Sequence, residues 1–307
     1  MAAAAADSAI AASMNNIHQR LISGPLILAA VLFAGYWAPS VSICVVLATI
    51  AGLALMEFYH LLDLGGIPSF RIMGAVFSVV LIGATWASYS MNMAFLAGEQ
   101  ELVVIFGLII AILVRQFPQK YNDQPLATMA CTLLGFLYVP FLFNYFTKLA
   151  FSWEPTGWLG TASATGRLLV FYLVAVVKFT DVGAFVVGSR WGRHKLIPRI
   201  SPGKTWEGFL GGILTGLVIS LVFRWIVGGQ FGVVTMHVHD AIVLGLLLPV
   251  MGTFGDLTES MLKRAANAKD SSGIVPGMGG MLDVLDSLLF AVPALFIYVK
   301  WFLVMMP

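Results

Sequence analysis

Four polar side chains share one face of an otherwise apolar segment in the last third of the chain. Asp256, Glu259, Ser260 and Lys263 stand at offsets of zero, three, four and seven residues, which is the repeat of a single helix face. Ionisable groups within such a segment are costly and usually face a cavity, a partner or an ion. The stripe therefore predicts a single polar face on an otherwise apolar helix, at which such a cavity, partner or ion would be met.

A second pair of charges precedes the stripe. Lys178 and Asp181 lie three residues apart in another apolar run, so they share one helical face. A structural ion pair explains this spacing as well as a binding site does. Both interpretations stay open at this point.

A glycine-rich segment, 269–280, follows the stripe and leads into a helix that opens with Asp283 and Asp286. Glycine lets backbone amides approach a phosphate, and the start of a helix adds further N–H donors. Carboxylates at that point suit Mg²⁺, which typically binds one or two carboxylates, waters and substrate phosphates. The alternative is that both aspartates only complement the helix dipole. That alternative does not explain why Asp256 and the neighbouring lysines are present in an apolar segment.

Basic residues gather in the segment 192–208, which contains Gly203, Lys204 and Thr205 in the order of a P-loop ending. A P-loop is excluded because its first glycine would fall on Pro198 and because the flanking segments are apolar helices. The basic side chains still suit a polyphosphate. For any one of them, a role in membrane orientation or in contacting lipid headgroups is the alternative.

The composition places these residues in a bilayer. Of 307 residues, 59% are hydrophobic and 10% are charged, and the mean hydropathy is +0.92, outside the range of ordinary globular domains. A membrane-crossing helix needs about 20 apolar residues, and lipid requires every backbone polar group to be paired internally. The predicted fold is all-α, a polytopic transmembrane bundle of about nine helices. Their expected spans are 21–38, 40–62, 72–90, 101–117, 126–148, 167–189, 207–228, 240–260 and 285–305.

The connections between these spans differ in basic residues. If the N-terminus is cytoplasmic, the inner connections hold most of them, and the outer side holds little beyond Lys148, Arg167 and Arg224. The positive-inside rule then predicts a cytoplasmic N-terminus, cytoplasmic active-site loops and an outer C-terminus. Residues 1–20 are expected to form a flexible cytoplasmic tail, and 21–307 a single membrane domain with its motifs in 175–290. The short connections fit a bacterial inner membrane.

Small residues form a further stripe at Gly208, Gly212 and Gly216. Such a stripe lets another helix approach closely. Packing inside the bundle is the first interpretation, and a contact in a homodimer is the second. The two cysteines, Cys44 and Cys131, lie in apolar stretches and indicate neither a disulfide framework nor a thiolate metal site.

Three separated blocks resemble the phosphatidate cytidylyltransferase family, also called CDP-diacylglycerol synthase. The stretch 260–286 resembles its signature of a serine, Lys-Arg, Lys-Asp, Pro-Gly, a Gly-Gly pair and spaced aspartates. The stretch 200–208 is similar to the family's cytoplasmic loop, and 178–188 to the helix before it. Two positions depart from the pattern, with Met278 in place of the usual histidine and Val284 in place of the usual arginine. A role for that histidine in proton transfer and for that arginine in phosphate binding therefore does not carry over to these two positions.

The resemblance implies an enzyme that transfers CMP from CTP to phosphatidic acid, giving CDP-diacylglycerol and pyrophosphate. It implies Mg²⁺ bound by Asp256 and Asp283, both catalytic together with Lys204 and Lys263, and leaves a second mono- or divalent cation open. The expected partners are CTP, phosphatidic acid and the bilayer, without nucleic acid. Substrate contacts are expected from Lys178, Asp181, Ser201, Lys204, Glu207, Ser260, Lys263, Arg264, Lys269, Asp270, Gly279, Gly280 and Asp286.

This chemistry needs no dedicated nucleophile from the protein. A phosphate oxygen of phosphatidic acid is ionised near neutral pH, so its attack on the α-phosphorus of CTP depends on alignment and charge neutralisation. Two other classes stay open. A CTP-dependent lipid kinase of the polyprenol or phytol type would donate the γ-phosphate instead, although the signature block speaks against it. A polytopic transporter would also bury charges, but the sequence contains no recognisable inverted repeat.

Overall fold

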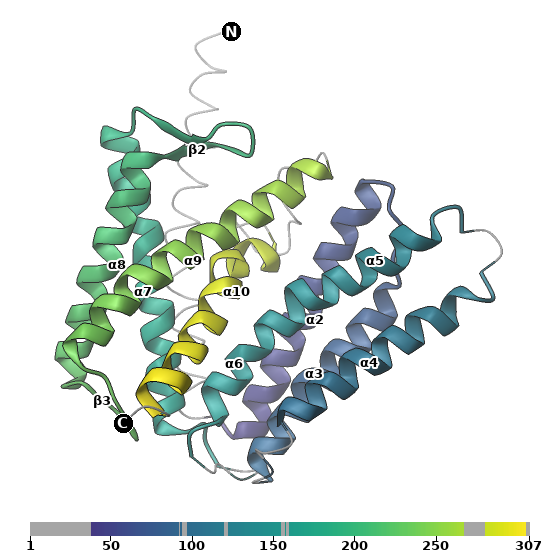
Figure 1. Cartoon of the computed structure of the whole chain (residues 1–307), viewed down its shortest axis with the longest axis horizontal. Helices are drawn as coiled ribbons and strands as arrows, with labels where there is room; N and C mark the ends of the chain where they lie inside the picture. The colour runs from purple at the N-terminus through teal and green to yellow at the C-terminus, as the bar shows by residue number, and fades with distance from the viewer. Residues whose placement is uncertain are drawn as a thin grey trace, which may run out of the picture.

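The computed structural model describes residues 38–91, 93, 97–119, 122–154, 157, 160–266 and 280–304. The predicted tail 1–20 and nearly all of the segment 21–38 lie outside the described residues, as do Lys269, Asp270, Met278 and Gly279. The described part is a bundle of long helices with a short hairpin at either end (Figure 1). The predicted all-α bundle is confirmed.

The helices follow the predicted spans closely. In chain order they are α2 Ser40–Leu64, α3 Arg71–Ser90, α4 Ala97–Gln116, α5 Pro125–Phe136, η2 Leu137–Phe141, α6 Leu142–Phe151, α7 Ala164–Trp191, α8 Trp206–Val227, α9 Val238–Ala265, α10 Met281–Tyr298 and η3 Val299–Val304. Among the described residues, seven helices are long and apolar enough to cross a membrane, with α5–η2–α6 and α10–η3 each forming one of them. The helix α4 is outside that set, so the count of nine is not confirmed.

A proline shapes the span that joins α5 to α6. Pro140 lies in the π-helical segment η2 in the middle of that span. Because proline lacks an N–H group and its ring crowds the preceding turn, it breaks the regular hydrogen-bond ladder. The wider π-turn absorbs this break, and the helix continues from Pro125 to Phe151.

The glycine stripe of α8 packs inside the bundle. A Cβ atom on Gly208 would lie 2.8 Å from the carbonyl oxygen of Ala184 on α7, and one on Gly216 would lie 2.4 Å from Cγ of Pro249 on α9. Gly212 is likewise buried against α7. The first interpretation of the stripe is therefore confirmed, while a homodimer stays a prediction that needs another surface.

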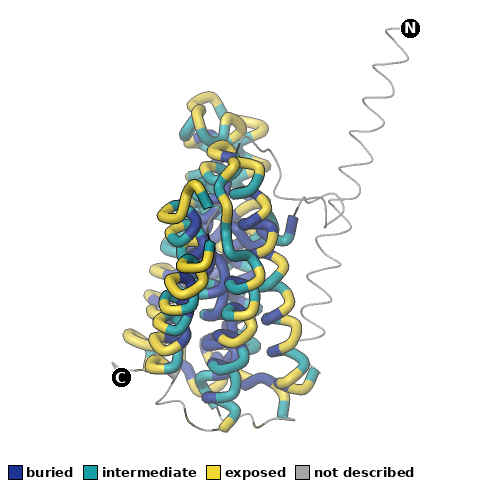
Figure 2. The backbone as a smooth tube through the Cα atoms, turned by 90° about the vertical axis from the view of Figure 1, so that its right-hand side faces the viewer, coloured by how far each residue is buried: buried dark blue, intermediate teal, exposed yellow. Residues whose placement is uncertain are grey.

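The outer faces of the helices are apolar. Figure 2 shows exposed positions repeated along the outside of the bundle. They include large hydrophobic side chains such as Ile72, Val103, Phe106, Leu214 and Ile226. Apolar surface on this scale is stable against lipid but not against water. The chain is thus an integral membrane protein.

Two hairpins mark the opposite ends of the bundle (Figure 1). Strands β1 Lys195–Ile197 and β2 Ser201–Thr205 pair between α7 and α8. Strands β3 Gln230–Phe231 and β4 Val234–Thr235 pair between α8 and α9. The segment 192–208, expected to be a loop, is therefore partly a strand pair, because local pairing satisfies backbone groups that no neighbouring helix reaches.

Candidate active site

The charged stripe of α9 lies directly against the start of α10. A Cβ atom on Gly255 would fall only 2.1 Å from the carbonyl oxygen of Asp286, so the two backbones touch at this point. The following residue, Asp256, is thereby brought beside α10. A larger residue at 255 would force the helices apart.

Three carboxylates meet where α9 and α10 touch. One oxygen from each of Asp256, Glu259 and Asp286 lies within 4.8 Å of the others. Glu259 is fully buried and Asp286 nearly so, whereas the Asp256 side chain keeps 33% of its surface exposed. Within the described ranges, no other group of three or more His, Cys, Asp or Glu side chains has this spacing. The three residues are called the carboxylate group below.

Lys263 bridges this group to Asp283. Its Nζ atom lies 2.7 Å from Oε2 of Glu259 and 2.7 Å from Oδ1 of Asp283. The other oxygen of Asp283 accepts a hydrogen bond of 2.6 Å from the backbone N–H of Gly280. Because both Asp283 oxygens have protein partners, the geometry makes this residue a helix cap and a counter-ion of Lys263. The predicted metal role of Asp283 stays a prediction.

The β1–β2 hairpin reaches the group through Lys204. The ammonium group of Lys204 lies 2.6 Å from Oδ2 of Asp256, and Ser260 Oγ contacts Oδ1 of the same carboxylate at 3.4 Å. A weak contact of 3.5 Å from Arg264 Nε to the carbonyl oxygen of Ile200 joins α9 to the hairpin turn. The structure thus brings together Lys204, Asp256 and Ser260, which the sequence assigned to one site.

Helix α7 closes another side of the site. Lys178 Nζ lies 3.8 Å from Asp181 Oδ2 and donates a hydrogen bond of 3.0 Å to the carbonyl oxygen of Val284. Ser287 Oγ lies 2.9 Å from Oδ1 of Asp286 and 3.4 Å from Oδ2 of Asp181, and so links α7 to the carboxylate group. A cation from α7 therefore stands beside position 284, where the family pattern has arginine.

The balance of charge in this site is negative. Five carboxylates face three lysine ammonium groups, which leaves two negative charges in excess when all are ionised; the groups are Asp181, Asp256, Glu259, Asp283 and Asp286 against Lys178, Lys204 and Lys263. In addition, Oε1 of Glu259 is buried and has no hydrogen-bond partner among the described residues. An all-oxygen donor set with uncompensated negative charge fits Mg²⁺.

Three other predicted residues, within the part of the chain that the structure describes, have contacts with nearby segments and not with the carboxylate group. Glu207 lies 2.6 Å from Nδ1 of His194 and accepts hydrogen bonds from the N–H groups of Arg193 and His194, which ties the hairpin to the start of α8. Ser201 pairs with Ile197 in the hairpin, and the N–H of Gly280 is taken by Asp283. Substrate contacts by Glu207, Ser201 and Gly280 stay predictions.

One carboxylate that contacts the start of α10, outside the charged site itself, is missing from the sequence prediction. Glu57 of α2 is only 3% exposed, and its Oε1 and Oε2 atoms accept hydrogen bonds from the N–H groups of Met281, at 2.9 Å, and Leu282, at 2.8 Å. A glutamate inside the apolar span 40–62 was the available signal, since ionisable residues at membrane depth are seldom incidental. These amides were expected to serve a phosphate, but in this structure they donate to a carboxylate of the chain.

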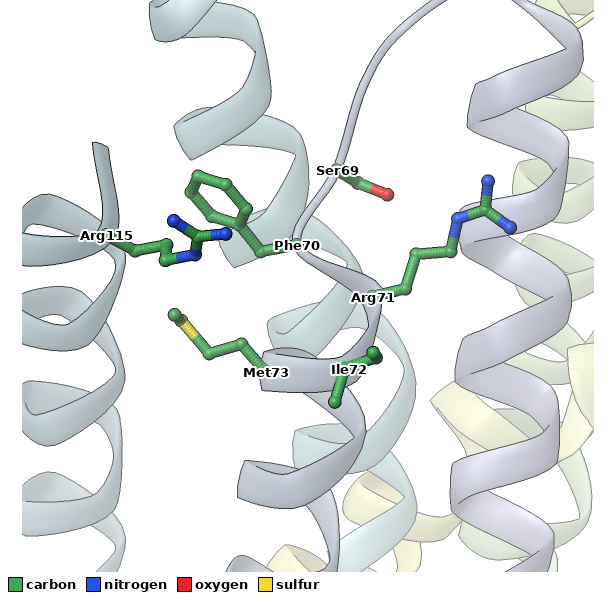
Figure 3. A pocket seen from close by; sticks show the side chains of 6 residues that line it. All are labelled: Ser69, Phe70, Arg71, Ile72, Met73 and Arg115. Carbon is green, nitrogen blue, oxygen red and sulfur yellow. The ribbon is translucent and has the colours of Figure 1, made fainter. Parts of the chain in front are cut away.

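A cavity of about 340 Å³ lies at the start of α3 (Figure 3). None of its lining residues is a predicted site residue, and Arg71 forms an ion pair with Asp63. Without a carboxylate in its lining, this cavity cannot hold a divalent cation in the way the carboxylate group can. Its lining residues are Ser69, Phe70, Arg71, Ile72, Met73 and Arg115.

Comparison with known proteins identifies the family of the chain. Residues 18–302 match the cytidylyltransferase family. An uncharacterised protein of Escherichia coli (strain K12) is 34% identical over 172 residues, 54% of this chain and 56% of that protein. The phosphatidate cytidylyltransferase of Bacillus subtilis (strain 168) is 37% identical over 169 residues, 55% of this chain and 57% of that protein. The chain thus covers less than two thirds of either relative's length.

A third relative aligns almost completely. The phosphatidate cytidylyltransferase of Staphylococcus haemolyticus (strain JCSC1435) is 31% identical over 257 residues, 79% of this chain and 94% of that protein. The family match extends through the charged site and nearly the whole chain. On this evidence, the chain belongs to the cytidylyltransferase family.

Proposed function

We propose that the chain transfers CMP from CTP to phosphatidic acid and so produces CDP-diacylglycerol and pyrophosphate. The observation that carries the proposal is the carboxylate group with Lys204 and Lys263 beside it, in a membrane chain of the cytidylyltransferase family. CTP and phosphatidic acid are both anions and repel each other. A site with carboxylates that can hold a cation, and with lysines beside them, can neutralise this repulsion. Two relatives are named phosphatidate cytidylyltransferase, which describes transfer of a cytidylyl group to phosphatidate.

Mg²⁺ would be held by Asp256, Glu259 and Asp286. Support comes from their mutual spacing and from the buried Oε1 atom of Glu259, which has no hydrogen-bond partner in the part of the chain that the structure describes. When bound, the ion would neutralise phosphate charge and stabilise the leaving pyrophosphate. Asp283 would act indirectly, because it fixes Lys263 and closes the first turn of α10.

The residues of the chain would orient and neutralise the substrates. A phosphate oxygen of phosphatidic acid forms a bond to the α-phosphorus of CTP, the bond from that phosphorus to the bridging oxygen breaks, and pyrophosphate leaves with the electron pair. Lys204, on an exposed hairpin, can exchange Asp256 for a phosphate oxygen, while Lys263 stays fixed between two carboxylates. Lysine at these positions lowers the barrier by electrostatic stabilisation of the developing charge.

The site end of the bundle would face the cytoplasm of a bacterial cell, with the C-terminus on the outer side. Basic residues support this orientation. Among the described residues, the β1–β2 end holds Arg190, Arg193, Lys195, Arg199, Lys204, Lys263 and Arg264, whereas the β3–β4 end holds Lys148, Arg167, Arg224 and Lys300. CTP is available only on the cytoplasmic side. Phosphatidic acid would reach the site from the inner leaflet.

The test is a labelling experiment in mixed micelles of detergent and phosphatidic acid. We expect label from α-³²P-CTP to enter lipid and label from γ-³²P-CTP to leave as pyrophosphate, both only with Mg²⁺ or a similar divalent ion. Diacylglycerol or polyprenol in place of phosphatidic acid should accept no label. Transfer of the γ-label to lipid would instead identify a lipid kinase.

A further inference from the structure

We propose that Glu57 is a positioning residue of the active site, whose carboxylate clamps the first turn of α10 and so sets the carboxylate group. This inference rests on the proposed function, because it assigns Glu57 to the same metal site. Its basis is a contact between segments more than 220 residues apart in the chain. No predicted site residue lies on α2.

The clamp has the geometry of a helix cap supplied by another helix. The first N–H groups of a helix have no partner within it. At α10, the side chain of Asp283 takes the N–H of Gly280, and the two oxygens of Glu57 take the next two, on Met281 and Leu282. Hydrogen bonds from N–H groups to a carboxylate are charge-assisted and stronger than neutral ones. The negative charge also lies at the positive end of the helix dipole.

This cap controls the residues that follow it. Asp283 and Asp286 lie one and four residues after Leu282 on α10, and they face Lys263 and the carboxylate group. A shift in the first turn of α10 therefore moves Asp286 relative to Asp256 and Glu259, which α9 holds. Removal of residues that hydrogen-bond to metal ligands typically changes metal affinity or activity by about 10- to 100-fold. Glu57 acts through the backbone of α10, so we expect its effect at the lower end of that range.

The cap also determines where phosphate can bind. With Met281 and Leu282 donating to Glu57, the start of α10 offers these N–H groups to no ligand. Substrate charge must then be met by the lysines and by the cation. The start of α10 thus has a structural role, since its N–H groups bind Glu57, whereas the carboxylate group takes part in the reaction.

The experiment compares Glu57→Gln with Glu57→Asp in purified, detergent-solubilised full-length protein. Glutamine keeps the volume but turns an NH₂ group toward one N–H, whereas aspartate keeps the charge with a shorter reach. We expect the Mg²⁺ concentration for half-maximal turnover to rise roughly tenfold or more in Glu57→Gln and less in Glu57→Asp. The rise in unfolding temperature on adding Mg²⁺ should shrink in the same order, a readout that needs no substrate.

Glu101→Gln is the matched control. Glu101 is also a buried carboxylate, paired at 2.7 Å with Lys148 between α4 and α6. Its hydrogen-bond and ion-pair partners among the described residues, Lys148 and Asn144, lie outside the active site. Its removal should lower stability and leave the Mg²⁺ dependence unchanged. A Glu57→Gln variant with wild-type Mg²⁺ dependence would overturn the inference, and so would equal losses in both glutamine variants. Wild-type turnover that needs no divalent ion would instead overturn the metal site of the proposed function.

Discussion

The carboxylate group predicts that Asp286→Asn has opposite effects on stability with and without Mg²⁺. Asparagine keeps the volume and can still accept the hydrogen bonds from Ser287, which Oδ1 of Asp286 accepts now. It removes one of the two negative charges that the site has in excess when all its groups are ionised. Without the metal, this change relieves repulsion; with the metal, it removes a ligand.

The size of the effect follows from the spacing. Two like charges at 4.8 Å, the upper limit of the separation between these oxygens, repel by about 3.5 kcal/mol at an effective dielectric constant of ~20. Exposure of Asp256 and the nearby ammonium of Lys204 reduce this value, so we expect a net stabilisation of about 1–2 kcal/mol without Mg²⁺. Turnover should fall at least about 100-fold, equivalent to roughly 2.7 kcal/mol of transition-state stabilisation.

The assay measures thermal unfolding of the purified variants in chelator and in saturating Mg²⁺, and turnover with α-labelled CTP. The comparison variant is Asp283→Asn, which loses the ion pair with Lys263 and should be less stable under both conditions. Asp286→Asn should unfold a few degrees above wild type in chelator and below it in Mg²⁺. If Asp286→Asn is less stable than wild type in chelator, or keeps the full gain from Mg²⁺, the assignment of the ligands is refuted.

Two further predictions concern orientation and charge. In a background without native cysteines, Gly203→Cys should react with a membrane-impermeant thiol reagent only from the cytoplasmic side and Val233→Cys only from the opposite side; labelling of both from one side would contradict the proposed orientation. Lys178→Met should lower turnover about 10-fold or more, because it removes a cation from beside the carbonyl oxygen of Val284. Adding Val284→Arg should recover part of the loss in the same turnover assay, and no recovery would show that position 284 cannot carry the charge.

Periodicity was enough to locate most of the bundle from the sequence. The apolar spans coincide with helices because a membrane leaves the backbone no other way to pair its polar groups. The same rule could not foresee the strand pair at 195–205, since outside the lipid the backbone has alternatives. It also could not decide the number of spans, because α4 carries Glu99, Glu101 and Arg115 close to its apolar core.

The site was predictable where its residues share one helix. The stripe from Asp256 to Lys263 required only a helical repeat, and the structure keeps it on one face. A helical repeat does not show which residues of two different helices touch, so the contacts between helices could not be predicted from it. Spacing along α10 made Asp283 and Asp286 equivalent, whereas Lys263 and the Gly280 amide occupy Asp283 and leave Asp286 with the carboxylate group. Glu57 was missed for the same reason, because its partners are two backbone amides that sequence patterns do not show.

The roles of these carboxylates follow from how closely two helices approach. At Gly255 the backbone of α9 comes so near to Asp286 that no side chain fits between them. That contact places Asp256 and Glu259 opposite Asp286, and it turns Asp283, one turn earlier, toward Lys263. Mutual repulsion of the three acids opposes the contact, while Glu57 on α2 holds the start of α10 in place. The bundle therefore holds three like charges close together, and the proposed divalent cation would relieve their repulsion. This explains why a site of that kind would lie between two helices rather than on one.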